Sequence, residues 1–222
     1  MPSYTFVSTA NAFALRGAKI VFADSNPLNP NIDAGSLAGL ITEKTRAIVV
    51  VHYGGIACDM ETIMELAAKH RLFVVEDAAQ CVDAFCNDTP LGSFGHLAAF
   101  SFHETKNITS GEGGMLVVND ASLIERAEIV REKGTNRAAF SRGEVEKYEW
   151  VSLGSSFLPN ELTAAFLYGQ LEHLGIIQQN RMESWQRYRN LLSPLENKGY
   201  IGLPYVPRSE EHTSELQSPN TI

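Results

Sequence analysis

The sequence predicts an α/β fold built on a sheet that is at least partly parallel. Residues 47–52, AIVVVH, form a continuous apolar run of the kind found in strands covered on both faces, and residues 72–77, LFVVED, are the next predicted strand. Between them, residues 60–70 place apolar side chains at helical spacing. A strand, a helix and a second strand in this order indicate a crossover connection, so we expect the two strands to be parallel.

The remaining elements follow from the same two periods. Asp59 can cap the helix between those strands, because Asp is a preferred N-cap residue, and the helix would bury Ile63, Met64, Ala67 and Ala68. Residues 18–24, 97–100 and 114–119 are predicted strands, and residues 120–134 and 160–198 are predicted helices, the last interrupted near Gly175 and around Ser193 and Pro194.

Composition bounds the class of protein. The chain has 222 residues, of which 44% are hydrophobic and 20% charged, as in ordinary globular proteins. A formal net charge of -8 without a basic block makes nucleic acid and anionic membranes poor partners. We expect no membrane-spanning helix and no signal peptide, because the sequence contains no run of about 18 to 20 apolar residues and no signal peptide is visible at its start. The three cysteines lack zinc-type spacing, which predicts reduced thiols, no metal site and a cytoplasmic protein.

The two ends of the sequence stand apart from this pattern. Residues 1–17 begin inside a predicted loop and helix, without a strand before them. Residues 208–218, RSEEHTSELQS, lack any apolar period and match the translation of a common sequencing adapter residue for residue. We therefore expect residues 1–207 to be the natural part and residues 208–222 to be an artefact of sequencing; a natural disordered acidic tail is the alternative.

Polar residues follow the predicted strands at one edge of the sheet, which is where open α/β sheets bind ligands. Glu76, Asp77 and Gln80 follow one strand, and Lys106 lies about thirty residues later on a glycine-rich turn. A strand-end carboxylate and a lysine suit pyridoxal 5'-phosphate (PLP), whose aldehyde is held by a lysine and whose ring nitrogen pairs with an Asp. On spacing alone, an ordinary helix cap and a solvated surface lysine remain alternatives.

Three longer motifs add a resemblance. VVEDAAQ, FSFHETKNITSGEGG and PSYTFVSTANAF resemble the DegT/DnrJ/EryC1/StrS family of PLP-dependent sugar aminotransferases, over residues 1–207. The resemblance implies the large domain of an aspartate aminotransferase-like, fold type I transferase, with a mostly parallel sheet flanked by helices. It also implies truncation at both ends, with the last helices leading to a missing small domain, so we expect the chain by itself to bind PLP poorly and to be inactive.

The resemblance assigns roles to five residues that match the family's motifs. It implies that Lys106 is the Schiff-base lysine and that Asp77 is the partner of the pyridinium nitrogen. It places Gln80 near the ring hydroxyl, Ser101 at the cofactor phosphate, and Phe6 in a stack on the cofactor ring. Core packing is the alternative role for Phe6. The lysine must be neutral to react, so burial or nearby positive charge would have to lower its pKa.

The resemblance gives weaker indications elsewhere. We expect glycines 111, 113 and 114 to let the backbone turn tightly behind the lysine. His103 is a candidate for contact with the sugar or its diphosphate, and Asn136 and Arg137 are candidates for contact with the nucleotide sugar. Ser155 and Ser156 lie in the segment expected to reach the cofactor phosphate of a partner subunit. In that segment many relatives carry Asn at the position of Leu158. A structural role is the alternative for His103.

Motifs HETKN, REKGTNR and LGSSFLPNELTAA further resemble family members that make dTDP-4-amino-4,6-dideoxygalactose for surface polysaccharides such as enterobacterial common antigen. This implies amino transfer from glutamate to C4 of dTDP-4-dehydro-6-deoxyglucose in a homodimer with shared active sites. Three alternatives remain: another nucleotide-linked keto sugar, a PLP-dependent sugar dehydratase, and a non-catalytic regulatory relative. The dehydratases replace the lysine with histidine, so Lys106 argues against them.

Overall fold

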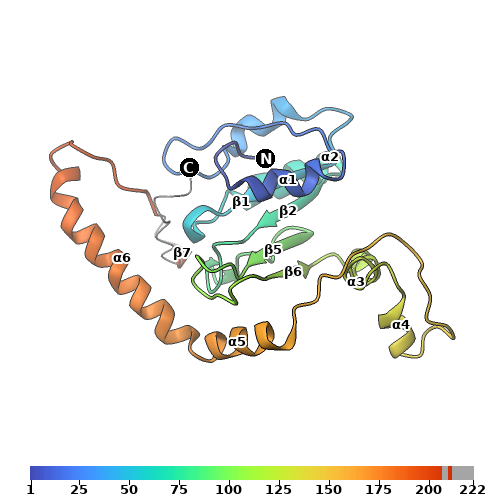
Figure 1. Cartoon of the computed structure of the whole chain (residues 1–222). Coiled ribbons are helices and arrows are strands. Elements are labelled where there is room, and N and C mark those ends of the chain that lie inside the picture. Colours follow the sequence, from blue (N-terminus) through green and yellow to red (C-terminus); the bar gives the residue numbers. More distant parts are fainter. Residues whose placement is uncertain (207–209, 212–222) are drawn as a thin grey trace.

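The computed structural model describes residues 1–206 and 210–211 and is centred on a four-stranded sheet (Figure 1). The strand order is β1-β2-β5-β6. Strands β1 (Ala47–Val51), β2 (Phe73–Asp77) and β5 (Leu97–Ser101) are parallel neighbours, and β6 (Gly114–Val118) is antiparallel to β5. The predicted α/β class and the partly parallel sheet are confirmed, and the four strands lie where the apolar runs predict them.

Helix α2 (Met60–His70) connects β1 to β2 and covers one face of the sheet. The predicted cap is present, because the Asp59 carboxylate accepts a hydrogen bond from the backbone N–H of Thr62 at 3.1 Å. Ile63 and Ala67 are buried as expected, but Ala68 is exposed. Ile63 and Ala67 lie four residues apart and therefore share one side of the helix, whereas Ala68 is rotated away from that buried side.

The predicted strand over residues 18–24 is wrong. Within this segment only Ala23 forms a bridge, to Pro2, and Val21 and Phe22 are exposed. The backbone of Met1 and Ser3 does bond to this segment, with Met1 N to Val21 O at 3.2 Å and Ser3 N to Ala23 O at 3.2 Å. These bonds do not form a regular ladder, so the apolar run stays extended without becoming a strand.

The predicted long helical region is two helices, α5 (Glu161–Glu172) and α6 (Leu174–Glu196). The predicted break lies at His173, two residues before Gly175. The predicted second interruption is wrong, because Pro194 lies inside α6. A proline lacks the N–H that would bond the carbonyl four residues earlier. The Ser193 hydroxyl donates to that carbonyl, of Asn190, at 3.2 Å and so replaces the missing donor.

Shorter elements complete the described chain. Near the start, helix α1 (Val7–Ala14) lies over the sheet (Figure 1). The others are η1 (Ala34–Leu40), η2 (Tyr53–Gly55), β3 (Phe85–Cys86), β4 (Thr89–Pro90), η3 (Ala121–Leu123), α3 (Ile124–Arg131), α4 (Arg137–Ser141) and β7 (Glu210–Glu211). Strands β3, β4 and β7 form a small second sheet. Apart from β7, residues 207–222 lie outside the described residues, and with them the prediction for residues 208–222.

A buried carboxylate ties this core together. Glu76, in β2, is completely shielded from solvent and accepts four hydrogen bonds. Its Oε1 accepts from the backbone N–H of Phe94 at 2.9 Å and of Gly95 at 2.5 Å. Its Oε2 accepts from the backbone N–H of Gly92 at 2.8 Å and pairs with His52 Nε2 at 2.8 Å. The segment after β1 and residues 92–95, here called the 92–95 loop, are thus both attached to the middle of the sheet.

The hydrogen bonds around His52 assign its tautomer. The backbone N–H of Cys58 donates to His52 Nδ1 at 3.0 Å, so Nδ1 is an acceptor and Nε2 carries the proton that is donated to Glu76. Gly92 has a φ of 94°, a backbone conformation that residues other than glycine rarely adopt, and this allows the 92–95 loop to curl around the carboxylate. Burial alone would raise the pKa of Glu76, but the hydrogen bonds from His52, Gly95 and Gly92 lower it below its ordinary value.

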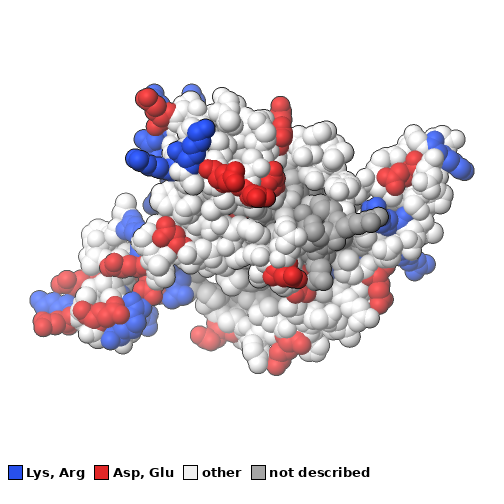
Figure 2. Space-filling model, turned by 180° about the vertical axis from the view of Figure 1, so that it is seen from behind, with Lys and Arg blue, Asp and Glu red and all other residues white. Residues whose placement is uncertain are grey.

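Among the described residues, none of the helices combines the length and the apolar character needed to cross a membrane. Acidic and basic side chains are interspersed over the face seen in Figure 2, and uncharged areas separate the groups. The three cysteines are free thiols, as predicted. One of the exposed charge clusters joins Arg142 to Glu128 and Glu144 by hydrogen bonds of 2.7 to 3.1 Å.

We predict that Glu76→Gln destabilises the fold strongly. An amide has one acceptor oxygen where the carboxylate has two, so its NH₂ group would face donors that now bond to Glu76. We expect the free energy of unfolding to fall by about 3 kcal/mol or more, as for a buried network that loses a charged acceptor. Urea unfolding of the chain would measure this loss. Glu65→Gln, at an exposed position of α2, is the matched control, and equal effects of the two changes would contradict the prediction.

The same carboxylate gives stability a pH dependence. Because the pKa of Glu76 is lowered on folding, its contribution is present above the ordinary pKa of 4.5 and is lost as the pH falls through the lower, folded value. The stability difference between the wild type and Glu76→Gln should therefore be largest near neutral pH and shrink below about pH 4.5. A difference that stays constant between pH 7 and pH 3.5 would contradict this assignment.

Candidate active site

The carboxyl ends of β1, β2 and β5 meet at one edge of the sheet, as the sequence predicts. In the register, Asp77 of β2 is paired with Ala99 of β5, and Ser101 lies two residues further along β5. Side chains two residues apart in a strand share a face, so Asp77 and Ser101 lie on the same face of the sheet. Ala99 between them is exposed, so this face is open to solvent beside the strand ends.

The Asp77 carboxylate is held from two sides. Thr9 Oγ1, on α1, donates to Asp77 Oδ2 at 2.6 Å, and the backbone N–H of Ala79 donates to Oδ1 at 3.1 Å. The Thr5 and Thr9 hydroxyls lie 2.8 Å apart and are hydrogen-bonded. Sequence reasoning missed Thr9. Its only signal is a threonine on the sheet-facing side of a short helix, and such residues usually serve packing alone.

Gln80 joins the segments that follow β1 and β2. Its side chain is buried, and its Oε1 accepts a hydrogen bond from the backbone N–H of Gly54 at 2.5 Å. Gly54 adopts a φ of 66°. The structure therefore places Gln80 at the predicted edge, one turn after Asp77. Its predicted role beside the cofactor ring hydroxyl stays a prediction.

Lys106 lies in residues 102–113, here called the lysine turn, which connects β5 to β6. The turn is closed by the backbone N–H of Phe102, which donates to Gly113 O at 2.8 Å, and within it the backbone N–H of Lys106 donates to His103 O at 3.0 Å. Ser101 Oγ, at the end of β5, accepts from the backbone N–H of His103 at 3.3 Å. Lys106 is half-buried. The structure thus places the predicted hydroxyl at the end of β5 and the predicted lysine in the turn that follows, beside the strand that carries Asp77.

Of the three glycines behind Lys106, Gly111 has the backbone conformation expected for a tight turn, and Gly113 and Gly114 lie where a side chain would not fit. Gly111 has a φ of 80°, which favours glycine. A Cβ on Gly114 would lie 2.8 Å from Phe100 O, and a Cβ on Gly113 would clash with Ser110 Oγ. The lysine turn therefore needs small residues where it rejoins β6.

Sequence reasoning also missed the contact that fixes the lysine turn to α6. Gln178, the one buried residue of α6, accepts a hydrogen bond from Asn107 Nδ2 at 3.3 Å and donates to Val82 O at 3.2 Å. It thus joins the segments that follow β2 and β5. Asn107 Oδ1 is buried without a hydrogen-bond partner among the described residues, directly beside Lys106 in sequence. A single Gln in an exposed helix gives no sequence signal for such a contact.

Phe6 immediately precedes α1, the helix that carries Thr9. Its side chain is 59% exposed, so the structure does not use it as a core residue. The alternative of core packing for Phe6 is therefore wrong. An exposed aromatic ring at the start of a helix that contacts Asp77 is available to stack on a ligand.

The weaker candidates make local contacts in this chain. Asn136 bonds the backbone of Lys147 and Glu149, and Arg137 pairs with Glu132 at 3.0 Å. The segment with Ser155 and Ser156 pairs with the backbone of residues 130–133. His103 Nδ1 is hydrogen-bonded to Thr105 Oγ1 at 3.0 Å. Their roles toward a sugar or a partner subunit stay predictions.

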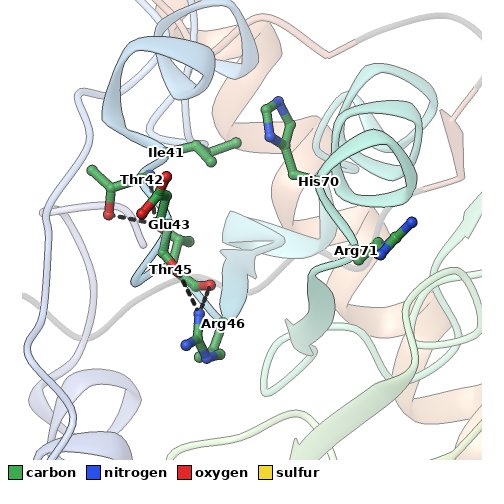
Figure 3. A pocket seen from close by; sticks show the side chains of 7 residues that line it. All are labelled: Ile41, Thr42, Glu43, Thr45, Arg46, His70 and Arg71. Carbon is green, nitrogen blue, oxygen red and sulfur yellow. Dashed lines mark hydrogen bonds between the residues drawn. The ribbon is translucent and has the colours of Figure 1, made fainter.

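A hollow of about 620 Å³ lies at the other edge of the sheet, near the starts of β1 and β2 (Figure 3). The charged side chains that line it do not point together into the hollow. The Arg46 guanidinium donates to the backbone carbonyls of Glu43 and Thr45 at 2.7 and 2.9 Å, and Arg71 points away from the hollow (Figure 3). The polar residues that match the family motifs gather at the carboxyl edge instead.

The residues at the carboxyl edge fit PLP by their chemistry. Asp77 offers an oriented carboxylate for a protonated ring nitrogen, Lys106 an amine for the aldehyde, and Ser101 a hydroxyl for the phosphate. Phe6 offers an exposed aromatic face. A carboxylate, an amine, a hydroxyl and an aromatic ring on one open edge are the groups that such a cofactor needs.

Comparison with known proteins agrees with this chemistry. The model of the DegT/DnrJ/EryC1/StrS aminotransferase family matches residues 1–219. The spore coat polysaccharide biosynthesis protein SpsC of Bacillus subtilis is 40% identical over 215 residues, which cover 96% of this chain and 54% of SpsC. The GDP-perosamine synthase of Caulobacter vibrioides is 35% identical, over 96% of this chain and 55% of that protein. The chain thus spans about half the length of these relatives.

Solved structures show the same fold. An aminotransferase from Psychrobacter cryohalolentis superposes with a TM-score of 0.88 at 32% identity, over 95% of this chain and 56% of that chain. The aminotransferase PseC of Helicobacter pylori, involved in the biosynthesis of pseudoaminic acid, gives a TM-score of 0.78 at 32% identity, over 86% and 50%. This is the fold of PLP-dependent fold type I transferases. The chain belongs to the DegT/DnrJ/EryC1/StrS aminotransferase family, whose members depend on PLP.

Proposed function

We propose that the chain forms the cofactor-binding part of an aminotransferase that aminates a nucleotide-linked keto sugar. The observation that carries this proposal is the Asp77 carboxylate at the end of β2, held by Thr9 and Ala79, next to the strand β5 that leads into the turn with Lys106. Because the chain spans about half the length of its relatives, we propose that the site is completed in a longer parent protein, as a homodimer in the cytoplasm. The experiments below use that parent protein.

In this proposal each residue of the edge has a defined role. Bound PLP would supply an electron sink for the amino group that is transferred. Asp77 would accept the hydrogen bond of its ring nitrogen, Ser101 would bind its phosphate, Gln80 would lie near its ring hydroxyl, and Phe6 would cover its ring. Lys106 Nζ would hold the aldehyde at rest and, once released by glutamate, would carry a proton to and from the sugar carbon that is aminated.

The substrate is proposed from two sources. The motifs HETKN, REKGTNR and LGSSFLPNELTAA support dTDP-4-dehydro-6-deoxyglucose as the keto sugar and dTDP-4-amino-4,6-dideoxygalactose as the product, for a polysaccharide such as enterobacterial common antigen. The names of two relatives, GDP-perosamine synthase and UDP-4-amino-4-deoxy-L-arabinose--oxoglutarate aminotransferase, support the broader class of nucleotide-linked 4-amino sugars. Mass spectrometry and NMR of the product formed from each nucleotide sugar would decide between them.

A regulatory, non-catalytic role is the second candidate, because one relative, 37% identical over 86% of this chain, is named a pleiotropic regulatory protein in Geobacillus stearothermophilus. A protein that only senses a ligand has no need for both a reactive amine and a paired carboxylate. The retention of Lys106 and Asp77 on one edge therefore favours catalysis. Amination of a keto sugar by the purified parent protein would distinguish the two.

We predict that Lys106→Ala abolishes turnover while the fold persists, because an alanine cannot hold the cofactor aldehyde or move the proton. Steady-state formation of the amino sugar would be measured, with far-ultraviolet circular dichroism as the check of folding. Lys69→Ala, at an exposed position of α2, is the matched control and should leave turnover unchanged. Turnover at the wild-type rate in Lys106→Ala would remove this residue from the mechanism.

We also predict that Asp77→Asn slows turnover by roughly a hundredfold or more, because a neutral amide stabilises a protonated ring nitrogen far less than a carboxylate does. The side chain keeps its shape, so binding of PLP should weaken less than turnover does. Asp83→Asn, an exposed carboxylate in the same connection between β2 and β3, is the control. An unchanged rate in Asp77→Asn would exclude the predicted pairing with the ring nitrogen.

A further inference from the structure

Helix α1 packs on the rest of the protein through a polar residue. Its one buried residue is Thr9, which is 8% exposed, whereas large apolar side chains beside it, Phe6 and Val7, are exposed. A short helix normally attaches to a sheet by burying an apolar stripe. Here the buried position is a hydroxyl, and that hydroxyl bonds to Asp77. The attachment of α1 is therefore directed at the candidate site.

The hydrogen bonds around Thr9 have a defined direction. Thr9 Oγ1 donates its proton to Asp77 Oδ2 at 2.6 Å, a distance typical of a charge-assisted hydrogen bond from a hydroxyl to a carboxylate. Its oxygen can then accept from Thr5 Oγ1, at 2.8 Å. Thr5 lies one turn earlier, so the two hydroxyls form a chain that ends on the carboxylate. A hydroxyl whose own oxygen accepts a hydrogen bond is a stronger donor, because hydrogen bonds in a chain polarise one another.

The two donors bind different oxygens of the Asp77 carboxylate. Ala79 N binds Oδ1 from the segment after β2, while Thr9 binds Oδ2 from α1, so the plane of the carboxylate is fixed by both. Each carboxylate oxygen has two lone-pair sites, which leaves acceptor capacity for a ligand. Removal of the Thr9 hydroxyl would leave Asp77 with the backbone donor of its own loop. The carboxylate could then rotate, and a ligand would have to order it on binding.

We propose that Thr9 is a positioning residue for Asp77, which it holds in the orientation that receives the ring nitrogen of PLP, with Thr5 as the supporting donor. This inference rests on the proposed function of the site. It gives helix α1 a role in the site in addition to the role proposed for Phe6, the residue before the helix. Thr9 acts through Asp77 and has no role as a proton carrier.

The test is PLP titration of the apo form of the parent protein, followed by the visible absorption of the bound cofactor. Ordering one free side chain costs about 0.5–1.5 kcal/mol, so Thr9→Val should weaken PLP affinity roughly three- to tenfold. Thr9→Ser keeps the hydroxyl and should stay within about twofold of the wild type. Thr5→Val should give a smaller loss than Thr9→Val, because it removes only the supporting donor. Thermal unfolding of each apo variant checks that the fold is intact, and Thr9→Ala replaces Thr9→Val if valine prevents folding.

A double-mutant cycle with Asp77→Asn separates positioning from a general structural effect. If Thr9 acts through the carboxylate, the loss caused by Thr9→Val should shrink to less than about twofold in the Asp77→Asn background. The same loss in both backgrounds, or equal losses in Thr9→Ser and Thr9→Val, would overturn the inference. Wild-type affinity in Thr9→Val would overturn it as well, while PLP binding that depends on Lys106 would leave the proposed function intact. A wild-type protein that binds no PLP would instead overturn the proposed function and this inference together.

Discussion

The buried carboxylate of Glu76 is the interaction on which the candidate site depends. A charge without solvent costs several kcal/mol unless its hydrogen-bonding capacity is filled, and here four donors fill it. Those donors come from His52 at the end of β1 and from the 92–95 loop that leads into β5. Glu76 is adjacent to Asp77 in β2, so the same set of bonds that closes the core also fixes the backbone that carries the site carboxylate.

Around this centre, two helices from distant parts of the chain attach through polar residues. Thr9 connects α1 to Asp77, and Gln178 connects α6 to Asn107 in the lysine turn and to Val82. Each is the one buried residue of its helix. Hydrogen bonds are directional, so such attachments fix position more narrowly than apolar contact does. The segments that follow the strands are thus held on their buried side by the hydrogen bonds of Glu76 and on their outer side by Thr9 of α1 and Gln178 of α6.

Much of the fold could be predicted because its signals are local. The apolar runs that became β1, β2 and β5 and the Asp59 cap depend on residues close in sequence. The Lys106 and Asp77 assignments came from the motif resemblance, and parallel pairing explains why they share an edge. Most of the failures depend on partners that are distant in the sequence. Residues 18–24 had the composition of a strand but form no regular ladder with residues 1–3. Pro194 is the exception, because a local contact, the Ser193 hydroxyl, accommodates it. Thr9 and Gln178 could not be found, because their partners lie 68 and 71 residues away.

The central claim is that this edge forms a PLP site with Lys106 as its amine. Borohydride reduction of the PLP-loaded parent protein, followed by peptide mass mapping, tests it most directly, because reduction makes the bond between cofactor and lysine permanent. We expect one phosphopyridoxyl group per chain, on the peptide that contains Lys106. A label on another lysine, such as Lys133 beside Glu132, or no stoichiometric label at all, would contradict it.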